Sequence, residues 1–258
     1  MKLQQLPHNL LKLILCDVLH DSHHDLVPTL VCSFGKAVRR ATYAVLVESL
    51  VLEDSDDVLY EAEHRLKPSL FALVLEKREL RSRVIKLSIV ESAHIATEPL
   101  NDQALRDTLT GFFALREFVW TTDRVPSDGL CQALANAQLS SFSFLPHDRT
   151  LRWSGCGLTA LPSRMSTMRL ACLSSEGIKQ LRIALSAMPA LEILQLEATP
   201  YVDDTLMLTI ASTLTRLRIL RIRDMAGSKL TDVGIQALCD GSRSLQILEL
   251  QDIEGRQS

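Results

Sequence analysis

Long apolar stretches, blocks of like charge and closely spaced cysteines are all scarce in this chain of 258 residues. No apolar run is long enough to cross a bilayer, which argues against a membrane-spanning helix. Basic residues are scattered and the formal net charge is only -3, so nothing indicates a nucleic-acid or anionic-membrane binder. Hydrophobic residues make up 47% of the chain, and we therefore expect a soluble protein with a substantial core.

The cysteines are also far apart, and no two of them have C-x-x-C spacing. Each lies among apolar or small residues, which predicts buried, reduced thiols and a cytosolic or nuclear protein, although an even count leaves disulfides open. The six are Cys16, Cys32, Cys131, Cys156, Cys172 and Cys239.

Catalytic and cofactor motifs are missing as well. The chain contains no G-x-G-x-x-G, no P-loop and no G-x-S-x-G. "SFGK" at 33–36 lacks its companion motifs, and Cys156 in "WSGCG" (153–157) has no histidine nearby. "HDSHHD" at 20–25 could ligate zinc by composition, but it has no second cluster, and a loop between helices explains it equally well. We therefore expect neither an enzyme nor a bound metal or cofactor.

What the chain does contain is an internal repeat. The phrase "SLQILELQDI" (244–253) has close copies in "RLRILRIRDM" (216–225) and "ALEILQLEAT" (190–199), and weaker copies of L-x-x-L-x-L occur upstream. Successive last apolar positions are separated by 37, 31, 24, 26, 26, 26 and 28 residues. Those positions are Leu52, Ile89, Trp120, Phe144, Leu170, Leu196, Ile222 and Leu250.

Within each repeat, the spacing of the apolar residues changes from that of a strand to that of a helix. The L-x-L alternation predicts a short strand with its leucines on one face. The stretches 101–113, 174–188, 203–214 and 231–244 have helical periodicity and capping residues, such as Thr231 and either Ser174 or Ser175. A unit this small cannot bury its leucines alone, so we expect the units to stack into a solenoid, with a parallel sheet on one side and helices on the other.

These units resemble the leucine-rich repeats that follow F-box motifs, with phrasing such as "LTDVGIQALCDGSRSLQILEL". The resemblance implies an α/β solenoid with parallel strands on the concave face and helices on the convex face. In that family an Asn or Cys stands three residues after the last leucine. Here that ladder is absent, and the positions hold Ser55, Ser92, Asp123, His147, Leu173, Thr199, Met225 and Ile253.

Residues 1–46 do not fit the repeat. The stretch "LPHNLLKLILCDVL" has the spacing of an amphipathic helix preceded by Pro7. A secretory signal is the alternative, but polar residues interrupt its apolar run and Asp17 follows it. A second apolar stripe follows the polar loop and ends at the basic pair Arg39 and Arg40.

This segment resembles an all-helical F-box, which docks a substrate receptor onto the Skp adaptor of a cullin ubiquitin ligase. Its loop is longer than usual, and the tryptophan expected after L-V-C is missing. A helical cap on the solenoid is the alternative. By resemblance, the adaptor-binding residues would be Leu6, Pro7, Leu10, Leu11, Ile14, Leu15, Leu26, Leu30, Val31 and Cys32.

A solenoid of this kind binds partners through the strand residues that point away from its leucines. Strands lie about 4.8 Å apart, so we expect Glu197 beside Arg223 and Arg221 beside Glu249, either as self-neutralising ion pairs or as a recognition patch. The candidate target-binding residues are Arg169, Gln195, Glu197, Arg221, Arg223 and Glu249.

We therefore expect an F-box-like segment at 1–46 and about eight irregular leucine-rich repeats at 47–258. The resemblance implies a substrate-recognition subunit of a Skp-cullin-F-box ligase, whose partners are a Skp-type adaptor and an unknown target protein. The alternative is a leucine-rich scaffold or inhibitor without a ligase link. Only "EGRQS" follows the last repeat, which predicts a tail folded over the end, an edge that pairs, or a chain shorter than its relatives.

Overall fold

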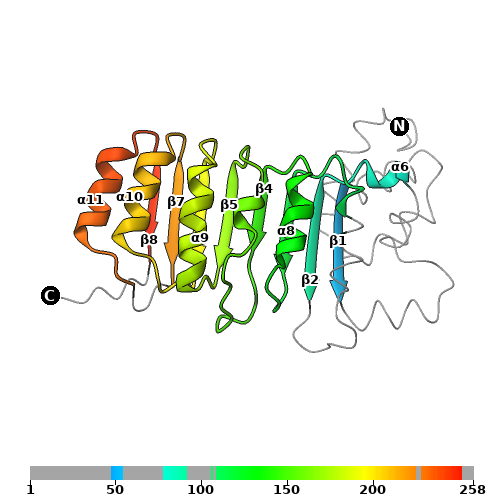
Figure 1. Cartoon of the computed structure of the whole chain (residues 1–258), viewed down its shortest axis with the longest axis horizontal. Helices are drawn as coiled ribbons and strands as arrows, with labels where there is room; N and C mark the ends of the chain where they lie inside the picture. The colour runs from blue at the N-terminus through cyan, green and yellow to red at the C-terminus, as the bar shows by residue number, and fades with distance from the viewer. Residues whose placement is uncertain (1–47, 55–77, 92–105, 107–108, 225–227, 252–258) are drawn as a thin grey trace, which may run out of the picture.

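The computed structural model of the chain describes residues 48–54, 78–91, 106, 109–224 and 228–251. Over this part, one parallel sheet runs the length of the molecule, and its strands follow one another in chain order (Figure 1). The strands are β1 (Ser49–Asp54), β2 (Lys86–Glu91), β3 (Glu117–Thr121), β4 (Ser141–Phe144), β5 (Thr167–Ala171), β6 (Ile193–Glu197), β7 (Ile219–Arg223) and β8 (Ile247–Leu250).

The register of the sheet confirms the predicted repeat. Each last apolar position of the L-x-x-L-x-L pattern lies opposite the same position of the next strand, as in Leu170 opposite Leu196 and Leu196 opposite Ile222. These side chains are fully buried in the middle strands because the alternation of a strand turns them all to one face. All eight predicted strands are therefore present.

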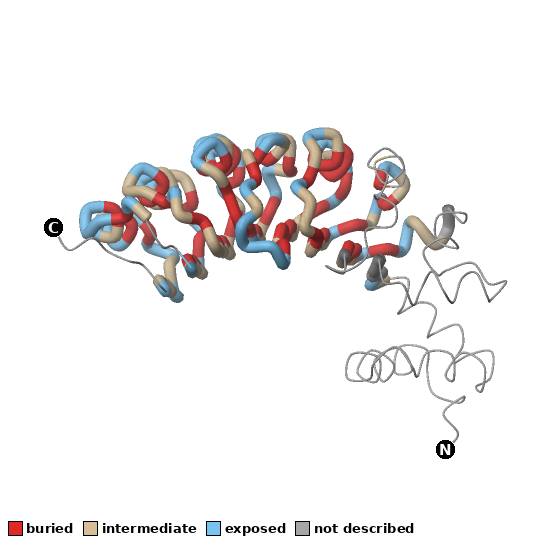
Figure 2. The backbone as a smooth tube through the Cα atoms, turned by 90° about the horizontal axis from the view of Figure 1, so that it is seen from below, coloured by how far each residue is buried: buried red, intermediate tan, exposed pale blue. Residues whose placement is uncertain are grey.

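Helices cover the buried face of the second half of the sheet (Figure 1). They are α8 (Asp128–Ala135), α9 (Ser175–Ser186), α10 (Asp204–Thr213) and α11 (Asp232–Gly241), and a short helix, α6 (Arg78–Arg81), precedes β2. Figure 2 shows the long helices along the outer side of a gentle arch and the strands along its inner side. The solenoid predicted from the repeat is confirmed over the described residues, although the predicted helix at 101–113 lies mostly outside them.

The predicted helix caps are also confirmed. Ser174 Oγ accepts a hydrogen bond from Gly177 N, and Thr231 Oγ1 accepts one from Val233 N. Each cap satisfies an amide that the first turn of a helix leaves without a partner. Neighbouring units are coupled as well, because Asp204 of α10 accepts from both the amide (2.8 Å) and the hydroxyl (2.6 Å) of Thr231.

The connection from β4 to β5 departs from the other late units, because a three-residue helix, η2 (Leu158–Ala160), stands where they carry a long one. The chain turns within 153–157, where Gly155 and Gly157 have positive φ angles of 70° and 81°. Trp153 fills part of the core, with its ring 5.0 Å from that of Phe144 in an edge-to-face arrangement. Residues 145–152 precede this turn as a loop.

The turns that leave β5, β6 and β7 repeat one conformation, because Cys172, Ala198 and Asp224 all have positive φ. One residue takes over part of the role of the missing asparagine ladder. The buried Thr199 Oγ1 donates to the carbonyl of Glu197 at 2.8 Å and accepts from Leu173 N at 3.4 Å. A hydroxyl at the expected position therefore joins two adjacent turns.

The expectation of buried cysteines is correct for two of the four cysteines in the described residues. Cys131 and Cys172 are buried, whereas Cys156 and Cys239 are exposed, and all four are free thiols. Cys156 is exposed because it stands in the turn between two glycines, and Cys239 because it lies on the outer side of α11. Cys16 and Cys32 lie outside the described residues.

Candidate functional site

All six predicted target-binding residues lie on the inner face of the sheet, away from the helices. They alternate along β5 to β8 with apolar residues that point into the core and are buried in β5 to β7 and partly buried in β8, which places the six together. Arg169, Gln195, Arg221 and Glu249 form one row across the four strands, and Glu197 lies opposite Arg223 in the next row. We call these six residues together with Arg149, which reaches them from a loop, the arginine face.

One of the two predicted ion pairs is present. Arg221 Nε lies 3.0 Å from Glu249 Oε2, as their direct opposition in the register predicts. The same carboxylate also accepts a hydrogen bond from Arg223 Nε at 2.9 Å. Glu249 therefore holds two guanidinium groups with a single negative charge.

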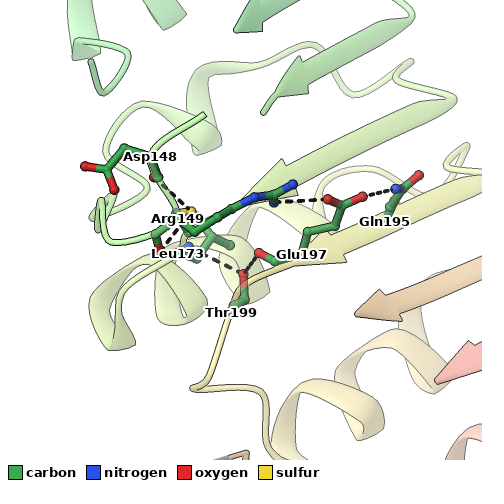
Figure 3. Close-up of polar contacts among 7 residues, drawn as sticks. Asp148, Arg149, Leu173, Gln195, Glu197 and Thr199 are labelled. Atoms are coloured by element: carbon green, nitrogen blue, oxygen red, sulfur yellow. Dashed lines mark hydrogen bonds and ion pairs between the residues drawn. The ribbon is translucent and has the colours of Figure 1, made fainter. Parts of the chain in front are cut away.

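The expected pairing of Glu197 with Arg223 is wrong. Although the two residues are opposite in the register, Glu197 Oε2 pairs with Arg149 Nη1 at 3.1 Å, and Gln195 Nε2 donates to Glu197 Oε1 (Figure 3). Cα register brings two side chains near each other but does not choose between partners. A third arginine from the β4–β5 loop reaches Glu197, and Arg223 turns to Glu249 instead.

The loop that carries Arg149 is held by its own hydrogen bonds. Asp148 Oδ1 accepts from the amide and the hydroxyl of Thr150, which lowers the pKa of this carboxyl below its usual range. Arg152 Nη1 donates to the carbonyls of Arg149 at 2.8 Å and Leu151 at 2.6 Å. The Cys172 thiol, buried beneath, lies 3.8 Å from the carbonyl of Arg149. Arg149 is thus positioned by the fold.

Arg149 is the residue of this site that sequence reasoning missed. Its segment, 145–152, belongs to a repeat of ordinary length that lacks the helical periodicity of its neighbours. Because the helix of this repeat has only three residues, the loop that follows β4 is longer than in the neighbouring repeats. That missing periodicity, together with Arg149 and Arg152 in the loop, was the available signal.

Beside the arginine face lies a row of three isoleucines at the beginnings of the strands. Ile193 is opposite Ile219, and Ile219 is opposite Ile247. Ile247 is 42% exposed, and the other two are partly exposed. We call these three residues the isoleucine row, and they give the inner face an apolar border.

The chemistry of this surface suits binding. Arginines can form paired hydrogen bonds with carboxylates and phosphates, and the isoleucine row offers area for apolar side chains. No group of His, Cys, Asp and Glu that could hold a metal ion occurs among the described residues. Burial raises the pKa of the Cys131 thiol to about 12, which leaves no reactive thiolate there near neutral pH.

Several predicted features lie outside the described residues. These include the possible zinc ligands at 20–25, the S-x-x-K stretch at 33–36 and all of the adaptor-binding residues. The latter are Leu6, Pro7, Leu10, Leu11, Ile14, Leu15, Leu26, Leu30, Val31 and Cys32. Within the described ranges, no helix is long and apolar enough to cross a bilayer.

No protein-family model matches the chain, and no curated protein matches it. A crystal structure of an internalin from Listeria monocytogenes is similar, with 14% identity and a TM-score of 0.35. The match covers 83% of this chain, which spans 64% of that internalin. A likeness this distant leaves the fold to rest on the repeat geometry described above.

Proposed function

We propose that this protein binds another protein on the inner face of its sheet. The observation that carries the proposal is the arginine face, where four strands present charged and polar side chains in register beside the isoleucine row. Arginine is enriched at protein interfaces and apolar side chains make up much of their buried area, and here the two lie side by side. The described residues assemble no catalytic constellation, so the proposed role is recognition.

We propose further that the partner is a target of ubiquitin transfer and that residues 1–46 dock onto a Skp-type adaptor. The support is the F-box-like pattern, including Leu6, Pro7 and the L-V-C at 30–32. In this role the chain is a substrate receptor that acts by proximity and carries out no chemistry itself. The expected location is the cytosol or the nucleus.

Adaptor docking is tested by mixing the purified chain with a Skp adaptor and measuring a stable complex by gel filtration. We expect a complex that is lost in the double variant Leu10→Asp, Ile14→Asp. Circular dichroism must show that the variant keeps the fold of the wild type. The absence of a wild-type complex, or a complex that persists in the folded variant, contradicts the ligase role.

Target binding has a separate test. Reversal of Arg221 and Arg223 to glutamate is expected to abolish capture of a target protein from lysate, because both side chains project from the inner face. If capture depends on these arginines while no adaptor binds, the chain is instead a scaffold or inhibitor without a ligase link.

A further inference from the structure

We propose that the arginine face receives an acidic segment of the partner protein, whose anionic groups lie over β5 to β7. This inference rests on the proposed protein-binding function and specifies the chemistry of the partner. The shared chemistry is an anionic oxygen group, supplied by a carboxylate or by a phosphorylated side chain.

The first argument is an excess of positive charge. The arginine face contains four arginines (Arg149, Arg169, Arg221 and Arg223) and two glutamates (Glu197 and Glu249), which leaves two positive charges unbalanced. This excess is local, since the whole chain has a formal net charge of -3. At the other end of the sheet Lys86 and Glu117 neutralise each other at 2.9 Å.

The second argument concerns the exposure and the bonding partners of Arg169 and Arg221. Arg169 is exposed, and in the part of the chain that the structure describes it contacts no carboxylate. Its neighbours in the row, Ser143 and Gln195, are uncharged. Arg221, whose side chain is 36% exposed, shares the Glu249 carboxylate with Arg223, and its Nε lies 3.0 Å from Oε2 without the geometry of a hydrogen bond. Both guanidiniums therefore retain donors for a ligand.

The third argument is spacing. Arg169 and Arg221 are two strands apart in one row, which corresponds to about 9.6 Å between their Cα atoms. In a polyproline II segment, residues three apart point to the same side at about 9.3 Å. An extended segment with acidic residues at every third position, laid across the strands, would therefore meet both arginines.

The isoleucine row favours a protein segment over a nucleic acid. Ile193, Ile219 and Ile247 line one side of the arginine face, and apolar side chains of a peptide can cover them. A phosphodiester backbone has no such groups, and among the residues named in the arginine face none is aromatic and able to stack on a base.

The probe is a fluorescein-labelled peptide of Glu-Leu-Pro repeats, with binding to the full chain measured by fluorescence anisotropy. A Lys-Leu-Pro peptide and an oligothymidylate of matched length serve as comparisons, and a phosphoserine version distinguishes phosphate from carboxylate. We expect the acidic peptides to bind, the basic one to fail, and affinity to fall as salt is raised.

Arg169→Glu combined with Arg221→Glu is expected to weaken binding of the acidic peptide about tenfold or more, because two attractive contacts become repulsive. The matched control is Arg216→Glu with Arg243→Glu. Both residues are exposed in turns before strands, outside the arginine face, and the control changes the net charge equally. Far-UV circular dichroism checks that both variants remain folded.

The proposal is overturned if the wild type binds no acidic peptide, if the control variant loses affinity as strongly as the test variant, or if the oligothymidylate binds as tightly as the peptides. These outcomes are separable from failure of the proposed function. Adaptor binding and target capture are measured without the peptide, and adaptor docking depends on residues 1–46.

Discussion

Arg149 and Glu197 are 48 residues apart in the chain, and their side chains meet at 3.1 Å across β5. Arg149 is half exposed, whereas the Glu197 side chain is only 14% exposed. The pair therefore ties the β4–β5 loop to the arginine face and occupies the one carboxylate that stands opposite Arg223. Arg149 thereby pairs with Glu197, and Arg223 pairs with Glu249 instead.

The first prediction concerns this pair. Arg149→Ala should weaken binding of an acidic peptide by roughly threefold to tenfold, because the freed Glu197 carboxylate repels the peptide and competes for Arg223. Adding Glu197→Gln to that variant should recover most of the affinity, as measured by anisotropy. The free energy of unfolding of the Arg149→Ala variant should differ from that of the wild type by less than about 1 kcal/mol, since the ion pair is partly exposed. Equal affinities of the single and double variants would contradict this role for Glu197.

The second prediction concerns the two tryptophans of the core. Trp153 is buried and its Nε1 has no hydrogen-bond acceptor among the described residues, whereas Trp120 Nε1 donates to the carbonyl of Arg124 at 2.7 Å. Trp153→Phe removes an unsatisfied donor, which offsets part of the lost volume. Trp153→Phe should therefore lower the free energy of unfolding by less than Trp120→Phe does. The loss should also be much smaller than the roughly 3–5 kcal/mol expected for Trp153→Ala.

Urea unfolding followed by circular dichroism measures these differences. The order of the two phenylalanine variants is the informative result, because both lose the same atoms from buried sites. If Trp153→Phe is the more damaging, the missing partner of Trp153 Nε1 does not affect stability.

The third prediction is a pH dependence at the junction of α10 and α11. Burial alone would raise the pKa of Asp204, but hydrogen bonds from Thr231 and the Gly234 amide outweigh it and lower the pKa. A depressed pKa in the folded state contributes stability above the unfolded value, about 3.9, and this is lost as pH falls through the folded pKa. Asp204→Ala should therefore destabilise the protein near neutral pH and have progressively less effect as the pH falls below the unfolded pKa of about 3.9.

Urea unfolding of wild type and variant at a series of pH values from neutral to well below about 3.9 measures this change. Asp240→Ala is the control, because Asp240 is an exposed carboxylate on α11 whose side chain, among the described residues, accepts a hydrogen bond from Gln236 of its own helix. A cost of Asp204→Ala that stays constant across this range would show that the carboxylate charge is unimportant.

The fourth prediction concerns thiol reactivity. Burial raises the pKa of both Cys131 and Cys172, whereas Cys156 and Cys239 are exposed. A maleimide should therefore modify the exposed pair first in the native protein, as read by peptide mass mapping, and all four at similar rates in urea. Native labelling of Cys131 as fast as Cys156 would contradict its burial.

The repeat made most of the fold predictable. Leu170, Leu196 and Ile222 mark the strands because two apolar residues separated by one position must share a face of a strand. Ser174 and Thr231 mark helix starts because a hydroxyl before an apolar helical stripe satisfies an exposed amide. Both rules are local, so they act within a few residues and can be applied without coordinates. The candidate face followed from the same alternation.

Tertiary structure alone chose the partners within that face. Glu197 lies near two arginines, and it pairs with Arg149 rather than Arg223 because the β4–β5 loop brings Arg149 close to its carboxylate. Likewise, Thr199 fills a position where asparagine was expected because its hydroxyl can reach Leu173 N in the neighbouring turn. Local periodicity specifies which side of a strand a residue occupies. Long side chains select among several nearby charges, and that selection depends on where distant segments of the chain come together.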